Sequence, residues 1–148
     1  MTPNQKPSET LSVLATINPM SQGAGTVSSG WVAVKNHLAL MALIQTGVLG
    51  ANATVDAKLQ QATDGAGTGA KDVTGKGITQ IVKATGDNKQ ALINCRSGEL
   101  DTEGGFAFVQ LSITVGTAAS LVGASLLGSF PRFSPADAFN QAGVVQIV

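Results

Sequence analysis

Residues 50–77 read GANATVDAKLQQATDGAGTGAKDVTGKG and change character halfway along. In the first half Val55, Ala57 and Leu59 alternate with polar residues, which is the period of a strand with one buried and one solvated face. The second half, from Gly65 to Gly77, is rich in Gly, Ala, Thr, Lys and Asp. The stretch therefore predicts a β-rich scaffold in which a core strand leads into a long, polar, projecting loop.

Strand patterns recur through the rest of the chain at spacings near a dozen residues. The clearest is 106–115, which places Val109, Leu111 and Ile113 on one face. Two apolar segments, 37–48 and 119–127, also contain good helix formers, but their short length and flanking glycines favour strands, with 37–48 expected to be buried on both faces. The expected strands are 26–35, 37–48, 54–63, 76–84, 90–96, 106–115, 119–127 and 144–148. About eight strands without a long helix predict an all-β antiparallel sandwich.

The N-terminal residues differ from this pattern. Residues 1–25 contain Pro3, Pro7 and Pro19 among Ser, Gln and Gly, and proline denies a strand its ladder donors. Only 11–17 is strand-like there. We therefore predict an extended arm over 1–25, with a disordered tail as the alternative, and a single β-sandwich domain over 26–148.

Composition excludes several classes of protein. The 148 residues carry nine basic and nine acidic side chains, so a strongly cationic nucleic-acid binder is not expected. Charged residues make up 12% of the chain, against about 25% in typical domains, while 43% is hydrophobic. Much of the surface is therefore expected to be covered by other chains, the alternative being a bland soluble domain. The N-terminus has no apolar core and the longest apolar run is 38–44, so we expect neither a signal peptide nor a membrane helix.

The glycine-rich segment contains a partial nucleotide-binding motif. Gly65, Gly67 and Ala70 formally match the dinucleotide fingerprint, but that motif needs a strand before it and a helix after it. Here the following residues are turn-like. The phosphate-loop pattern also fails, because Gly77 stands where Ser or Thr is required. No cofactor is expected.

Catalytic and metal-binding side chains are scarce. His37 is the only histidine and Cys95 the only cysteine, so we interpret them as a hydrogen-bonded structural histidine and a small buried hydrophobe. The acidic residues Asp64, Asp72, Asp87, Asp101 and Glu103 are interpreted as solvated loop carboxylates. We expect no catalytic residues, no metal site and no enzymatic activity.

The aromatic residues suggest one alternative. Trp31 is expected to anchor the core, while Phe130 and Phe133 lie in an irregular aromatic-proline stretch. Exposed loop aromatics are the feature that a carbohydrate-binding sandwich requires, and these two are the candidates.

The strings ATVDAKLQQATDGAGTGAKDVTGKGITQ (residues 53–80) and FVQLSITVGTAASLVGASLLG (residues 108–128) resemble small virion proteins of tailed bacteriophages. A sandwich of this size with an N-terminal arm is similar to head decoration, or cement, proteins. The resemblance implies a jelly-roll-like fold and a position on the capsid exterior, after synthesis in the host bacterial cytoplasm. It also implies that the arm and the loop over 65–77 contact other subunits.

The function expected from this resemblance is to stabilise an assembled phage capsid by bridging neighbouring capsomers. The implied partners are the major capsid protein and further copies of the chain, as a dimer or trimer, with no direct nucleic-acid or membrane contact. The alternatives are a tail or neck structural subunit, or a carbohydrate-binding β-sandwich for host attachment.

Overall fold

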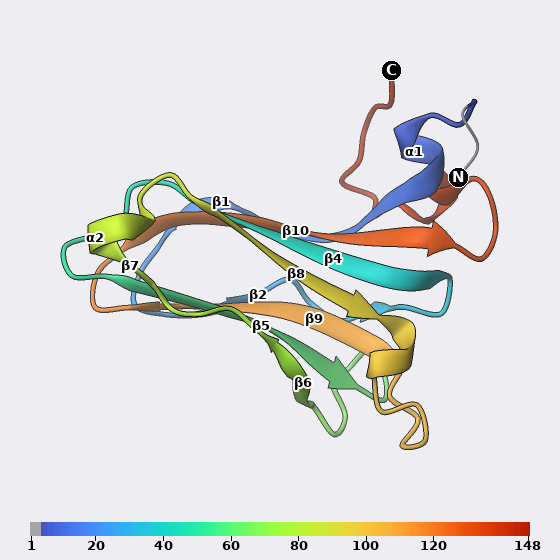
Figure 1. Cartoon of the computed structure of the whole chain (residues 1–148), viewed down its shortest axis with the longest axis horizontal. Coiled ribbons are helices and arrows are strands. Elements are labelled where there is room, and N and C mark those ends of the chain that lie inside the picture. Colours follow the sequence, from blue (N-terminus) through green and yellow to red (C-terminus); the bar gives the residue numbers. More distant parts are fainter. Residues whose placement is uncertain (1–3) are drawn as a thin grey trace.

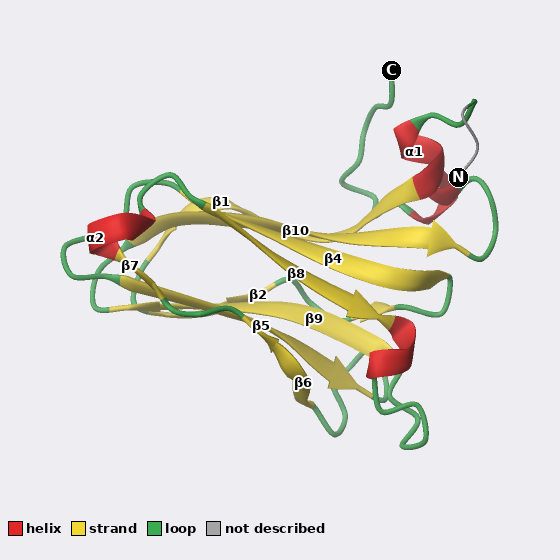
Figure 2. Cartoon of the chain, in the orientation of Figure 1, coloured by secondary structure: helices red, strands yellow, loops and turns green. Residues whose placement is uncertain are grey.

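The computed structural model describes residues 4–148 and consists of two packed antiparallel sheets (Figures 1 and 2). The first sheet comprises β1 (Leu11–Gln22), β10 (Ser120–Pro131), β4 (His37–Thr46) and β8 (Gln90–Arg96), in that order. The second comprises β2 (Gly25–Ser28), β9 (Phe108–Gly116), β5 (Thr54–Ala62) and β6 (Lys71–Gly77), with β3 (Val32–Ala33) beside β9 and β7 (Ile81–Val82) beside β5. The described residues also form four short helical turns: α1 (Pro7–Thr10), α2 (Lys83–Gly86), η1 (Ser97–Glu99) and η2 (Ala136–Phe139).

The order of the strands is that of a jelly roll. The chain passes from one sheet to the other at most connections, and consecutive strands share a sheet at β2 and β3 and again at β5, β6 and β7. β10 returns to lie between β1 and β4, and β9 returns between β2 and β5. The predicted antiparallel, jelly-roll-like sandwich is therefore confirmed. No helix of the described residues has the length and apolar character needed to cross a membrane.

The core lies between the two sheets and follows the predicted alternation. In β5 the side chains of Val55, Ala57 and Leu59 are buried, and they lie beside Val115, Ile113 and Leu111 of β9. The first sheet contributes Leu40, Ala42, Ile44 and Leu126 to the same cluster. Alternate residues face inward because successive side chains of a strand point to opposite faces.

The predicted boundary between an arm and the sandwich needs correction. Residues 11–22 form β1, which pairs along its length with β10 and is part of the sheet. The prolines do not prevent this, because β1 is an edge strand and its register shifts between Ile17 and Met20, around Pro19. Of the predicted arm, residues 4–10 precede the sheet, and residues 1–3 lie outside the described residues.

The loop expected to project over 65–77 is also corrected. Residues 71–77 form the edge strand β6, paired with β5, so the connection before it is short. That connection lies on aromatic rings: a Cβ atom on Gly65, Gly67 or Gly69 would contact a ring in each case, with Phe108, Trp31 and Phe106 as the respective partners. The predicted strand over 76–84 is correspondingly reduced to β7.

The predictions for the strand over 26–35, for Trp31 and for the C-terminal strand are also corrected. The strand expected over 26–35 is interrupted between β2 and β3, where Gly30 has φ 82°, a conformation outside the strand region. Trp31 lies in this break and packs against Gly67 at the surface of the sandwich rather than in the core. Residues 144–148 form no strand.

The segment 37–48 is a strand, as predicted, but it is not buried on both faces. Leu40, Ala42 and Ile44 are buried, whereas Met41 and Leu43, which point to the other side, are only half-buried. Apolar residues therefore lie on the outside of this sheet as well as on its inside.

Candidate docking surface on the four-stranded sheet

Charged residues are unequally divided between the two sheets. Arg96 is the one Asp, Glu, Lys or Arg in β1, β10, β4 and β8, all of which lie within the described residues. The second sheet carries five such residues in its strands: Asp56, Lys58, Lys71, Asp72 and Lys76. The outer faces of the two sheets are therefore chemically different.

The outer face of the four-stranded sheet is apolar along its middle. The strand register places Val13, Leu127 and Met41 in one row across β1, β10 and β4. The next row contains Leu43 and Leu92, on β4 and β8. Leu92 is 56% exposed and the others are half-buried among one another. We call this area the apolar face.

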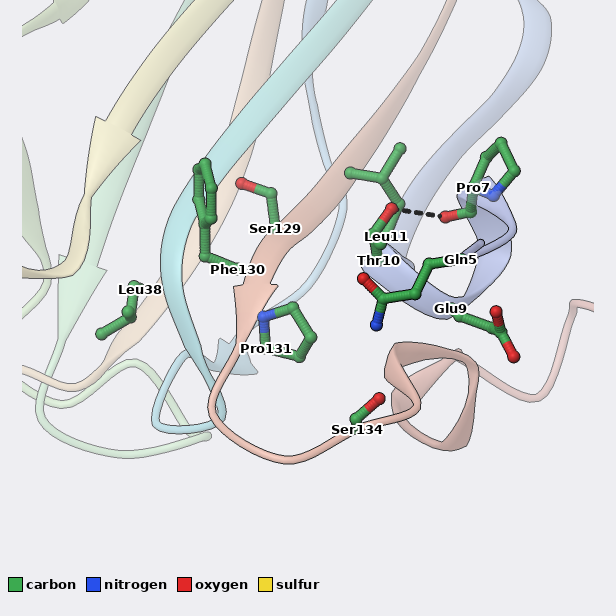
Figure 3. A pocket seen from close by; sticks show the side chains of 10 residues that line it. All are labelled: Gln5, Pro7, Glu9, Thr10, Leu11, Leu38, Ser129, Phe130, Pro131 and Ser134. Carbon is green, nitrogen blue, oxygen red and sulfur yellow. Dashed lines mark hydrogen bonds between the residues drawn. The ribbon is translucent and has the colours of Figure 1, made fainter. Parts of the chain in front are cut away.

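Phe130 stands at one end of the apolar face, between two depressions. The first, of about 530 Å³, is lined by α1, the start of β1 and the end of β10 (Figure 3). The second, also about 530 Å³, includes Ala39, Met41, Asn94 and Arg96. Two smaller depressions, of about 140 and 370 Å³, lie at the opposite end, around Pro19 and Gly123. The face therefore has depressions at both of its ends.

Phe130 itself has an unusual backbone. Its φ of 50° is left-handed, which is uncommon for a bulky residue and costs free energy of the order of 1–3 kcal/mol. Its side chain is 63% exposed, and that of Phe133 is 66% exposed. In Figure 3 the ring of Phe130 rises beside β4, on the side of the depression away from α1. The strain is thus associated with an aromatic ring presented to solvent.

His37 and Ser12 form a buried polar node. The Ser12 hydroxyl donates to the Ala136 carbonyl, so it accepts a hydrogen bond from His37 Nε2, at 2.9 Å. His37 Nδ1 is then an acceptor, and it is buried without a partner. Burial lowers the pKa of His37, because the charged ring would be poorly solvated. The predicted structural, hydrogen-bonded histidine is confirmed.

The node resembles the serine–histidine pair of a hydrolase only in its spacing. The side chains of Ser12 and His37 are 0% and 1% exposed, and neither lines one of the depressions described above. The serine proton is directed at a backbone carbonyl. These features fit a structural link between β1, β4 and η2, with the Phe139 ring packed edge-on at 5.7 Å from the His37 ring.

Cys95 lies in β8 with its side chain buried, as predicted. Burial raises the pKa of its thiol, since an apolar environment disfavours the thiolate. It fits the role of a small core residue.

Five acidic residues interact with neighbours and do not converge on a site, and Glu103 is exposed in a turn. Asp64 accepts hydrogen bonds from its own turn, including Thr68 Oγ1 at 2.6 Å, and this lowers its pKa. Four others form ion pairs with lysines. The hydrogen bond from the lysine is the main cause of the lowered pKa of three of them, whereas the pKa of Glu99 is lowered first by the backbone amide of Arg96 and then by its lysine. The pairs are Asp72 with Lys58, Asp101 with Lys71, Glu99 with Lys76, and Asp87 with Lys83. Within residues 4–148 no three metal-ligating side chains form a cluster.

The residues that match the nucleotide-binding motif do not form a phosphate cradle. Gly65 and Gly67 lie against aromatic rings, and Ala70 is followed by strand β6 and not by a helix. The dinucleotide motif therefore lacks the helix N-terminus that it needs.

Sequence reasoning did not find the apolar face. Alternation shows which residues of one strand share a face, but four separate strands had to be ordered before their outer residues could be joined. The available signal was the scarcity of charge in 11–22, 37–46, 90–96 and 120–131.

No known family model matches the sequence, and no curated protein matches it. Solved structures with some likeness include broad bean stain virus, at 13% identity and TM-score 0.47, covering 93% of this chain and 94% of the other. The naturally occurring empty top component of cowpea mosaic virus has 8% identity and TM-score 0.48, covering 87% and 96%. A CBM4 structure has 10% identity and TM-score 0.44, covering 71% of this chain and 61% of the other, so this chain spans less than two thirds of it. Sequence identities and TM-scores this low assign the protein to no family and carry no inference about its function.

Proposed function

We propose that this is a structural, non-enzymatic virion protein that stabilises an assembled phage capsid by bridging neighbouring capsomers. The observation that carries the proposal is the apolar face, a sheet surface with depressions at both ends and one charged residue, Arg96, in its strands. Burying apolar surface lowers the free energy by roughly 25 cal/mol per Å², so binding of another protein over this face is favourable. The charged outer face of the second sheet is suited to water.

The sequence resemblance to small phage virion proteins supports the capsid exterior as the docking site, with the major capsid protein as partner. Fold alone does not decide this, because jelly rolls serve as capsid, lectin and enzyme scaffolds. A subunit that binds the assembled shell and not its separated parts stabilises the shell by mass action. Many copies with modest affinity act together through avidity. Direct contact with nucleic acid or membrane has no part in this mechanism.

The Leu127→Lys variant tests the docking surface. Leu127 is half-buried in the centre of the apolar face, and burying an unpaired lysine beneath a partner is costly. We expect binding to undecorated capsids to weaken by roughly tenfold or more, equivalent to about 1.4 kcal/mol. Co-sedimentation of purified protein with capsids measures this, and capsid melting provides a second readout.

Thr114→Lys is the matched control for this experiment, because Thr114 is exposed on the outer face of the second sheet. The new lysine would lie beside Asp56, which is its neighbour in the register. It should bind capsids as the unmodified protein does. Unchanged binding by a folded Leu127→Lys variant, or no binding by the unmodified protein, would contradict the proposal.

A second function, carbohydrate binding, is favoured by one observation. Phe130 and Phe133 are both largely exposed, and Phe130 borders the depression drawn in Figure 3. Aromatic rings are suitable platforms for the apolar faces of sugars. If the protein attaches to host glycans, Phe130→Ala and Phe133→Ala should each abolish binding on a glycan array, while Leu127→Lys should leave it intact. Absence of any glycan signal from the unmodified protein would remove this candidate.

A further inference from the structure

The edge strand β8 has an open side. Along one edge it pairs with β4 in an unbroken register from Ala39↔Arg96 to Gln45↔Gln90. Along its other edge no strand of the described residues pairs with it. The opposite edge of the same sheet is different, since the backbone of Val13 in β1 is hydrogen-bonded by Asn140 and Gln141.

Alternation identifies which backbone groups point to the open side. The amide of Arg96 donates to Glu99 Oε2, at 2.7 Å, instead of to β4. In an antiparallel strand every second residue directs its N–H and C=O to the same side. The backbone groups of Gln90, Leu92 and Asn94 therefore also point away from β4, where no described turn or loop hydrogen-bonds them.

This edge lacks the features that normally prevent strands from pairing. Such features include proline, bulges and charged residues. Between Lys89 and Arg96 the sequence QALINC contains neither charge nor proline, and the register with β4 shows no bulge. The edge strand of the other sheet, β6, carries three charged residues and has an irregular register with β5.

The residues of this edge are self-complementary about Leu92. Gln90 and Asn94 are amides at equal distances from it, and Ala91 and Ile93 are apolar. If two such strands pair antiparallel with Leu92 at the centre, Gln90 of each copy lies opposite Asn94 of the other. Leu92 would meet the partner's Leu92. Arg96 would lie opposite the partner's Asn88, so that no like charges face each other.

We propose that two copies of this protein pair through β8, antiparallel, about a two-fold axis at Leu92. A two-fold interface uses the same patch on both subunits, which is what the self-complementary edge provides. The product is a continuous eight-stranded sheet, with the two apolar faces joined on one side. The proposal goes beyond the capsid function and does not depend on it, because no shell is needed for the pairing.

Opposite charges at position 92 test the pairing. Leu92→Lys would place two lysines directly opposite each other, and Leu92→Glu two glutamates; like charges in that position are destabilising. Each variant alone should dimerise roughly tenfold more weakly. An equimolar mixture should recover the dimer, because lysine then faces glutamate. Sedimentation equilibrium without capsids measures the dissociation constants, with Thr114→Lys as the control that dimerises normally.

Disulfide cross-linking tests the register. The Cα atoms of a hydrogen-bonded antiparallel pair are about 5.5 Å apart, within the range of a disulfide. Leu92→Cys should therefore form a covalent dimer on mild oxidation. Asn94→Cys, on the same face of the same strand, should not, because it would lie opposite the partner's Gln90. A monomeric unmodified protein, failure of the charge mixture to recover dimers, or equal cross-linking by both cysteine variants would overturn the proposal.

Discussion

Gly128→Ala is expected to destabilise the protein by about 3 kcal/mol, the upper end of the usual cost of overpacking a core. A Cβ atom at this position would lie 2.6 Å from Cδ2 and 2.7 Å from Cγ of His37. The ring has little freedom to move, because Ser12 holds Nε2 and Phe139 packs against the ring. Displacing it would break the node that links the sheet to η2. Equilibrium unfolding in urea measures the change.

Gly123→Ala is the matched control in the same strand. The nearest atom to its added Cβ is Pro19 Cα, at 3.3 Å, so a small adjustment is sufficient. We expect a loss below about 1 kcal/mol. In a protein that already carries His37→Ala, Gly128→Ala should lower the free energy of unfolding by less than it does alone, since the smaller side chain leaves room for the new methyl group. Equal losses for the two glycine variants, or full additivity with His37→Ala, would show that the ring is not the obstacle.

Gly67→Ala is expected to cost about 3 kcal/mol, from two effects. Gly67 has φ 83°, where a residue with a Cβ atom is destabilised by roughly 1–2 kcal/mol. The added Cβ would also lie 2.5 Å from Trp31 Nε1. The new methyl group therefore has to displace the indole ring against which the connection before β6 packs.

Gly75→Ala separates these two effects. Gly75 has a similar φ of 74°, but no atom lies within 4 Å of a Cβ added there. We expect only the conformational cost, about 1 kcal/mol. Thermal unfolding of both variants, with the shift in Tm converted to a free-energy difference, gives the comparison. If the two losses are equal, the contact with Trp31 contributes nothing and the connection is not anchored there.

These glycine variants also bear on the stretch from Gly65 to Gly77. Its composition predicts a free loop, because glycine and small polar residues usually mark one. In the structure Val73 is buried, β6 pairs with β5, and Lys71 Nζ lies 4.2 Å from the centre of the Phe106 ring. Shortening the segment would therefore expose the edge of β5 and destabilise the fold.

The sequence alone predicted those features that depend on a single strand. The alternation in 54–63 and 106–115 identified Val55, Leu59, Leu111 and Ile113 as core residues, because strand geometry sends every second side chain to one face. Glycines at 47 and 50 and short length were enough to identify 37–48 as a strand. The isolated His37 and Cys95 were correctly interpreted as buried structural residues.

Features that depend on which strands are neighbours required the tertiary structure. The local pattern marks only 11–17 as strand-like, and residues 11–22 join the sheet because β10, a distant segment, is their partner along the whole length. The apolar face exists only because β1, β10, β4 and β8 lie side by side, although β1 and β10 are about a hundred residues apart in the chain. Local propensity acts between near neighbours in sequence, whereas burial and strand pairing are decided between distant segments. The sequence therefore determined the all-β sandwich and its inner face, and the packing of distant strands decided its outer surface and its open edge.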